Sequence, residues 1–312
     1  MADQKQILLF GGIIVDQYVL VDSSPVKGGD ALISESFVRV GGCAINVGSA
    51  LHNLGMRPHI VSTVGDNAWG RQIRDYLRKR QFSERAIRFA EGRNSGYCIS
   101  IVDKDGERTF LTYKGCEAEF HSGMIPGDLC EQASLVYVTG YYLLAPEYAG
   151  EIVRQLTKLK EAGAFLVFDP GPLAASIRED ILLAVLRIAD LLLPNESEWD
   201  ILGRKLNWKR EDDSHVRELG IRHVVLKKGS RGVEVRTGRD CYTVPPFQVD
   251  SVDTTGAGDS FAGGLLYGLS AGYDLRQSVV IASACGAIAT TFLGPHGEFT
   301  FQDVTDMVEK ER

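Results

Sequence analysis

The segment VDTTGAGDSFAGGLLYGL, from Val252 to Leu269, carries the clearest chemical pattern in the chain. Its first half is a turn of small residues, and Phe261 and Leu265 then recur at the spacing of one helix face. Glycines let the backbone approach a ligand closely, and the free N–H groups at a helix start favour an anion. The segment therefore predicts a phosphate-binding turn that opens a helix.

Asp259 stands directly after the turn residues Gly256, Ala257 and Gly258. A carboxylate there would repel a resting phosphate, so its presence needs a reason. One reason is a general base that accepts the proton of an attacking hydroxyl. The alternative is an ordinary first-turn aspartate stabilised by the helix dipole, and this turn taken alone favours that alternative. The remaining motifs reverse the preference.

A second pattern lies near the N-terminus, where Gly41 and Gly42 precede a predicted helix from about Cys43 to Leu54. Apolar residues recur along it at helical spacing, and Gly55 follows as a C-cap. Asn46 lies in its first turn. A tight strand-to-helix turn with a surface asparagine explains this pattern on local grounds. Amide groups also suit the binding of sugar hydroxyls.

Two further motifs follow short apolar runs. LLLPNESEWDILG places Asn195 three residues before Glu198, which suits a helix cap. LKKGSRGVEV places Gly229 and Gly232 after a strand, which suits a hairpin turn. Lys227 beside them has the properties of an ordinary solvated lysine.

Two motifs together resemble the signatures of the ribokinase-like, or PfkB, carbohydrate kinase family. They are D-T-T-G-A-G-D from Asp253 to Asp259 and V-G-G-C-A-I-N-V-G from Val40 to Gly48. The resemblance covers nearly the whole chain. It implies an α/β three-layer sandwich with a mostly parallel central sheet flanked by helices, plus a small β-sheet lid. It also implies an enzyme that phosphorylates a sugar-like substrate with ATP and Mg²⁺.

The resemblance assigns roles around the D-T-T-G-A-G-D motif. Asp259 matches the catalytic base, and the amides of Gly256–Gly258 match the anion hole for the transferring phosphoryl group. Asp253 and Thr255 match residues near a structural monovalent cation such as K⁺. Asn195 and Glu198 match the family's N-x-x-E motif, which organises water and Mg²⁺ around the phosphates.

The remaining assignments concern the substrate and the nucleotide. The residues that bind the sugar in that family correspond here to Asp16, Gly41, Gly42 and Asn46. Cys43 replaces a larger polar residue of ribokinase itself, so ribose is not indicated.

The nucleotide-binding loop of that family corresponds here to Gly229 and Gly232. The resemblance also places Lys227 near the ATP phosphates. Arg108 is either a lid residue that reaches the substrate or a surface strand residue.

Short apolar runs bounded by turn residues alternate with longer segments of helical period along most of the chain. This alternation predicts βαβ units around a largely parallel, buried sheet. Two stretches interrupt it, residues 14–40 and 97–115, and the second has a hairpin pattern around Asp105-Gly106. We expect these stretches to pair as a lid on a single domain of residues 1–312. In the resembling family such a lid sometimes forms a homodimer interface.

Composition excludes several classes of protein. A chain of 312 residues that is 44% hydrophobic can bury a large core. The net charge of −7 and the pI near 5.5 argue against nucleic acid or an anionic membrane as the main partner. Six cysteines without a C-x-x-C pair, and no leader or membrane-span pattern, predict a cytoplasmic protein with free thiols.

Competing functions are weighed against the same residues. A nicotinamide dehydrogenase needs G-x-G-x-x-G, but Phe261 stands at the last glycine, and a Walker NTPase needs a Gly-Lys pair that the chain lacks. A nucleoside kinase of the same family is the main alternative, with Tyr141, Tyr142 or Phe110 as the wall for the base. A sugar-binding regulator without catalysis is the second, and the retained Asp259 argues against it.

Overall fold

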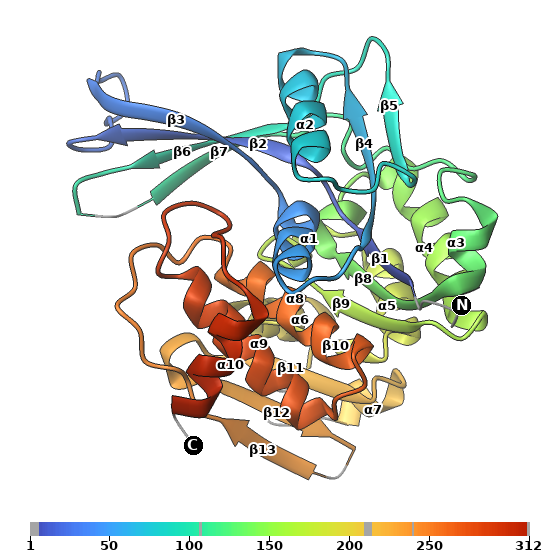
Figure 1. Ribbon diagram of the computed structural model, residues 1–312. Helices are drawn as coiled ribbons and strands as arrows, with labels where there is room; N and C mark the ends of the chain where they lie inside the picture. Colours follow the sequence, from blue (N-terminus) through green and yellow to red (C-terminus); the bar gives the residue numbers. More distant parts are fainter. Residues whose placement is uncertain (1–5, 106–107, 209–213, 239, 311–312) are drawn as a thin grey trace.

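The computed structural model describes residues 6–105, 108–208, 214–238 and 240–310. A central sheet, sheet A, runs through the body of the molecule (Figure 1). In order across the sheet its strands are β13 (Asp240–Val244), β12 (Val233–Thr237), β11 (His223–Lys227), β10 (Leu191–Leu192), β9 (Phe165–Asp169), β8 (Ala133–Thr139), β1 (Gln6–Phe10), β4 (His59–Gly65) and β5 (Ile87–Ala90). The pairings from β5 to β11 are parallel, whereas β12 and β13 continue the sheet as antiparallel strands.

Helices cover both faces of sheet A because its strands are apolar on both sides. In β1, Leu8 and Phe10 pack into one core, while Ile7 and Leu9 pack into the other. The first core is covered by α3 (Gly127–Gln132), α4 (Pro146–Glu161), α5 (Glu179–Ile188), α6 (Glu196–Leu206) and α7 (Ser214–Glu218). The second is covered by α1 (Cys43–Asn53), α2 (Ala68–Lys79), α8 (Ala257–Ser270) and α9 (Leu275–Ala289), and α10 (Phe301–Lys310) packs beside α9. The predicted three-layer α/β fold is confirmed.

Within the described chain, no helix is both long and apolar enough to cross a bilayer.

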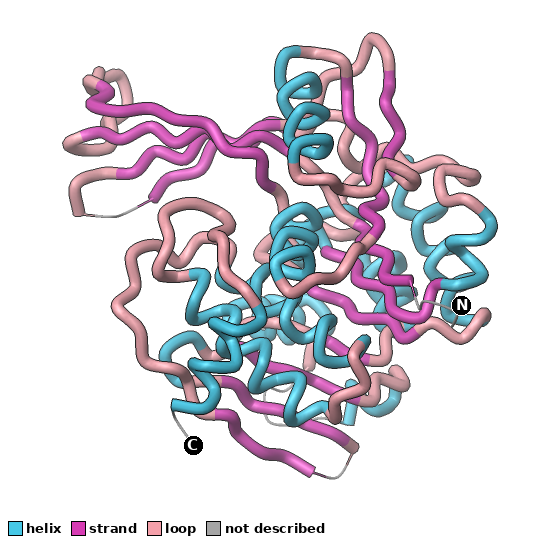
Figure 2. Tube along the Cα trace, in the orientation of Figure 1, coloured by secondary structure: helices cyan, strands magenta, loops and turns pink. Residues whose placement is uncertain are grey.

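The two interrupting stretches of the sequence form a separate four-stranded sheet, sheet B, which projects from the body (Figure 2). Its strand order is β3 (Ile33–Gly41), β2 (Ile14–Val21), β6 (Tyr97–Val102) and β7 (Arg108–Tyr113). β6 and β7 are antiparallel, as the hairpin pattern predicts, and β6 pairs in parallel with β2. Gly106, the second residue of the expected turn, lies outside the described residues.

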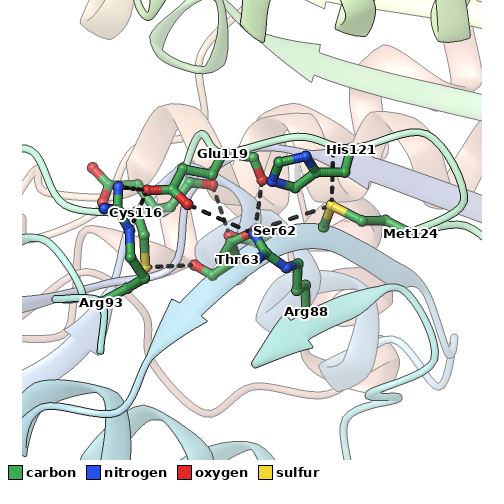
Figure 3. A network of polar contacts seen from close by, with 9 residues as sticks. Ser62, Thr63, Arg88, Arg93, Cys116, Glu119, His121 and Met124 are labelled. Carbon is green, nitrogen blue, oxygen red and sulfur yellow. Dashed lines mark hydrogen bonds and ion pairs between the residues drawn. The ribbon is translucent and has the colours of Figure 1, made fainter. Parts of the chain in front are cut away.

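A polar network fixes the point where the chain passes from sheet B alongside β4 of sheet A (Figure 3). Glu119 follows β7 and is 6% exposed, and its carboxylate accepts a 2.8 Å hydrogen bond from Nε of Arg93. Its backbone oxygen accepts a 2.6 Å bond from Oγ1 of Thr63 on β4, and Ser62 bonds the backbone oxygen of Glu117 at 3.2 Å. The segment that leaves sheet B after β7 is therefore held against β4 by hydrogen bonds.

Close packing of α8 against α9 depends on glycine. A Cβ at Gly264 would lie 2.8 Å from Cα of Ala282 and 2.8 Å from Sγ of Cys285. At Gly150 on α4 the nearest atom to an added Cβ would be 3.8 Å away, at the end of Arg154. These two helical glycines therefore differ in packing although their backbone conformations are alike.

We predict that Gly264→Ala lowers the free energy of unfolding by about 1–3 kcal/mol, because overpacking forces α8 and α9 apart. Gly150→Ala is the matched control, and we expect it to raise that free energy by about 0.5–1 kcal/mol because alanine restricts the unfolded chain. Urea unfolding followed by circular dichroism measures both. Equal effects of the two substitutions would contradict this account of the packing.

Candidate active site

The turn before α8 requires glycine at its N-cap. Gly256 has φ +75°, and a Cβ there would lie 1.9 Å from the carbonyl oxygen of Pro295. The Ala257 N–H donates to the carbonyl of Thr254 at 3.3 Å and so closes the turn. Gly258 lines a cavity together with Asp259. The first turn of α8 therefore presents backbone to that cavity, as the small-residue motif predicts.

Asp253 holds this turn in place. It is 1% exposed, and its two carboxylate oxygens accept hydrogen bonds from the N–H of Thr255 at 2.6 Å and of Gly294 at 2.9 Å. Two residues after Gly294, the ring of His296 hydrogen-bonds the carbonyl of Val40 at 3.0 Å. The segment after α9 thus connects the α8 turn to the end of β3.

Asn46 and Asp259 meet where α1 packs against α8. The Asn46 Nδ2 donates to Oδ2 of Asp259 at 2.8 Å, across 213 residues of sequence. Asn46 is 5% exposed, and its Oδ1 has no hydrogen-bond partner in the described part of the chain. An acceptor atom therefore remains available beside the carboxylate.

Gly41 and Gly42 are required for steric reasons that the sequence did not show. A Cβ at Gly41 would lie 1.9 Å from Oδ2 of Asp16, and Gly42 has φ +98° with the carbonyl oxygen of Gly12 only 2.6 Å from an added Cβ. Burial raises the pKa of Asp16 to about 7. Gly41 therefore leaves space for the Asp16 carboxylate at the start of α1.

A cavity of about 290 Å³ lies at the carboxyl ends of the sheet A strands, where ligands bind in open α/β sheets. The predicted residues that line it are Asn195, Glu198, Lys227, Gly229, Gly258 and Asp259. Cys43 and Tyr141 also line it, and so do Tyr137, Thr139 and Asp169, to which the sequence analysis did not point. A signal for Asp169 was present, because it is the polar residue that ends the buried run AFLVFD.

One buried ammonium lies among three carboxylates in this cavity. The Lys227 Nζ is 3.0 Å from Oδ2 of Asp169. Burial lowers the pKa of Lys227, but the carboxylates of Asp169, Glu198 and Asp259 outweigh it, so that pKa is raised overall. Lys227 is therefore an ion-paired residue of the cavity rather than a solvated surface lysine.

The two carboxylates nearest the predicted reaction have perturbed acidities. Burial raises the pKa of Asp259 to about 7, the hydrogen bond from Asn46 opposes the rise, and the charge of Asp169 adds to it. Burial and Asp169 also raise the pKa of Glu198 to about 7. Two acids that titrate near neutrality in one cavity are typical of catalytic sites.

The N-x-x-E motif forms a helix cap that also faces the cavity. The Glu198 N–H donates to Oδ1 of Asn195 at 2.9 Å, and the Asn195 N–H donates to Oε2 of Glu198 at 2.7 Å. Asn195 is the N-cap of α6. The capping interpretation of this motif is therefore correct, and its role toward Mg²⁺ stays a prediction.

Other predicted residues differ in position. Gly229 begins a 3₁₀ turn between the antiparallel strands β11 and β12, and Gly232 follows that turn. A Cβ at Gly232 would lie 2.2 Å from the carbonyl oxygen of Val244. The side chain of Arg108 lies outside what the structure describes. Of the three aromatic residues considered for a nucleoside base, Tyr142 is buried in the core and Phe110 is exposed on β7, whereas Tyr141 lines the cavity.

Comparison with known families matches residues 4–297 to the pfkB family carbohydrate kinase. The chain belongs to this carbohydrate kinase family. Among curated relatives, the uncharacterized sugar kinase YegV of Escherichia coli K12 is 28% identical over 301 residues, covering 95% of this chain and 91% of that protein. The ATP-dependent ribose-1-phosphate kinase of Halopiger xanaduensis is 30% identical over 285 residues and covers 91% of each chain.

Solved structures of pfkB-like kinases share the fold. A ribokinase from Thermotoga maritima superposes with a TM-score of 0.85 at 22% identity, covering 97% of this chain and 99% of that one. A Burkholderia thailandensis nucleoside kinase in complex with inosine gives a TM-score of 0.83 at 22% identity, covering 98% and 96%. At these identities the likeness establishes the fold.

For this pfkB family kinase, we predict that kcat/KM falls as the pH drops through about 7, because protonated Asp259 cannot accept a proton. Asn46→Leu removes the bond that favours the charged carboxylate, so we expect the acid limb of the pH profile to move to higher pH. Kinetics from pH 5 to 9 measure the shift. Glu198→Gln is the control, because glutamine does not titrate: an acid limb that disappears in this variant and does not move in Asn46→Leu would assign the limb to Glu198 instead.

Proposed function

We propose that the chain transfers the γ-phosphoryl group of ATP to a primary hydroxyl of a sugar or sugar-like molecule, with Asp259 as the base. One observation carries the proposal: a carboxylate with a pKa of about 7 is held by Asn46 at the start of α8, directly after the turn of Gly256–Gly258. Such a base is half ionised near neutral pH, where it can accept a proton. The adjoining backbone favours the phosphoryl charge.

The reaction follows from these positions. The substrate hydroxyl gives its proton to Asp259 as its oxygen forms a bond to the γ-phosphorus, and the bond from that phosphorus to the β–γ bridging oxygen breaks to release ADP. The Gly256–Gly258 amides stabilise the equatorial oxygens, although the Ala257 N–H also serves the turn. Lys227 supplies positive charge in the same cavity, and its raised pKa keeps it protonated at neutral pH.

The proposed sugar site uses Asp16, Gly41, Gly42 and Asn46. Support comes from the Oδ1 atom of Asn46, which is buried without a partner in the described chain and can accept a hydroxyl hydrogen bond. Arg108, at the start of β7 in the lid, is the last residue of the proposed substrate-binding set. Hydrogen bonds to the substrate hydroxyls that do not react fix the orientation of the hydroxyl that attacks. Such positioning supplies much of the rate in sites of this kind.

A nucleoside substrate is the second candidate, favoured by one residue. Tyr141 lines the cavity and has an aromatic face that a nucleobase could stack upon. The nucleoside kinase from Burkholderia thailandensis, solved with inosine, shares the fold. The substrate panel described below separates the two candidates.

ATP with Mg²⁺ fits the residues of the cavity. Glu198 is 5% exposed, and its carboxylate beside Asp169 has a raised pKa that a neighbouring cation would lower again. We propose that Asn195 and Glu198 hold the Mg²⁺ through water, with Gly229, Gly232 and Lys227 near the nucleotide. When bound, the ion neutralises charge on the phosphates.

A monovalent cation such as K⁺ is assigned to Asp253 and Thr255. Support comes from the Asp253 carboxylate, which is 1% exposed and so offers a buried negative charge to a cation.

Sheet B, with residues 14–40 and 97–115, is proposed as a lid that closes over the sugar and excludes water. We also propose that it forms a homodimer interface. Six large apolar residues of these segments are exposed: Val26, Leu32, Ile33, Phe110, Leu111 and Tyr113. Exposed apolar side chains of this size support an interface on the lid.

Asp259→Asn is predicted to lower kcat by about 10²- to 10⁴-fold because no base then accepts the hydroxyl proton. ATP affinity, measured by calorimetry, should change little. The assay is ADP release with Mg²⁺ over a panel of ketoses, aldoses, sugar acids, sugar phosphates and nucleosides, and the active compound decides between sugar and nucleoside. Near-normal turnover of the variant would refute the assignment of the base.

Leu111→Lys is predicted to shift a dimer toward monomer in sedimentation velocity, because it places a charge on the exposed surface of β7. Tyr273→Lys is the control at an exposed residue that lies between α8 and α9. A wild-type chain that sediments as a monomer at all concentrations would contradict the lid interface.

A further inference from the structure

One face of sheet B bears a row of polar side chains that begins at the proposed sugar site. The strand pairing places Arg39, Asp16, Cys98 and Thr112 opposite one another across β3, β2, β6 and β7. Thr112 Oγ1 lies 3.5 Å from Sγ of Cys98, so these side chains share a face. Lys114 comes two residues after Thr112 and so continues this face beyond the end of β7.

Lys114 reaches from this face to the wall of the active-site cavity. Its ammonium lies 4.7 Å from the ring centroid of Tyr141, a cation–π contact, and Tyr141 lines the cavity that contains Asp259. Burial raises the pKa of the Cys43 thiol in the same cavity, and the Lys114 charge partly opposes that rise. The ammonium is therefore electrostatically coupled to the cavity although the side chain is exposed.

Lys114 forms no ion pair with a carboxylate in the described part of the chain, although its charge partly opposes the rise that burial causes in the pKa of Glu117. Three other lysines form ion pairs: Lys227 with Asp169, Lys228 with Glu234 and Lys160 with Asp190. The ammonium of Lys114 instead lies against the ring of Tyr141. Arg39, another cation on this face, lies 5.0 Å from the ring of Phe37 on its own strand rather than against the cavity wall.

We propose that the substrate carries an anionic group, a carboxylate or a phosphate, which Lys114 binds at the end remote from the hydroxyl that is phosphorylated. The inference rests on the proposed function, because it names the class of sugar that this site takes. A neutral sugar offers an ammonium no charged partner, whereas an anion forms a charge-assisted hydrogen bond with it. Asp16 and Asp259 repel an anion, so the same charges orient the substrate with its hydroxyl toward the base.

Calorimetry with matched ligand pairs tests this inference in the presence of a non-hydrolysable ATP analogue. D-gluconate against D-glucitol tests a carboxylate, and fructose 6-phosphate against fructose tests a phosphate. In at least one pair we expect the anionic member to bind about 10-fold tighter or more to the wild type. Lys114→Met should weaken that member about 10- to 100-fold and the neutral member less than about 2-fold, while Lys114→Arg retains the preference.

Lys104→Met is the control, because Lys104 is an exposed lysine of the same hairpin. It should leave every affinity unchanged. The inference is overturned if neither pair shows a preference for the anion, or if Lys114→Met weakens both members of a pair equally. Failure of the proposed function is a separate result, since the wild type would then form no phosphorylated sugar from ATP in the substrate panel.

Discussion

The hydrogen bond between Asn46 and Asp259 is the contact on which the arrangement of the site depends. It requires α1 and α8 to approach closely, and Gly263 permits this because a Cβ there would lie 2.6 Å from Cβ of Ala50. The same approach places the small-residue turn of α8 beside the glycine pair that precedes α1. The contact between these two helices therefore brings the proposed sugar site and the proposed phosphoryl site together.

The buried carboxylate of Asp259 lowers the stability of the folded protein at neutral pH. The pKa of Asp259 in the folded chain, about 7, lies above the value near 4 of an unfolded aspartate. The protonated carboxyl therefore contributes stability below pH 4, and that contribution is lost as the pH rises through 7. At neutral pH the protein keeps the partly ionised Asp259 carboxylate in a buried position, and Asn46 and Lys227 reduce the cost. A loss of stability of this kind is common at functional sites.

Local patterns in the sequence predicted the fold well because buried strands and amphipathic helices are local features. The first helix, expected from Cys43 to Leu54, runs from Cys43 to Asn53, and the two interrupting stretches pair as sheet B. The charge environment of the cavity could not be predicted in the same way. Asp169 and Lys227 are 58 residues apart, and only the parallel order of β9, β10 and β11 brings them together. The position of Lys114 against Tyr141 likewise depends on how sheet B meets sheet A.

The most direct test of the central claim is a crystal structure of the chain with a non-hydrolysable ATP analogue, Mg²⁺ and the best substrate of the panel. We expect one primary hydroxyl of the substrate to lie about 2.6–3.2 Å from an Asp259 carboxylate oxygen and in line with the γ-phosphorus. A substrate hydroxyl that faces the γ-phosphorus from elsewhere, with Asp259 out of hydrogen-bond reach, would contradict the account.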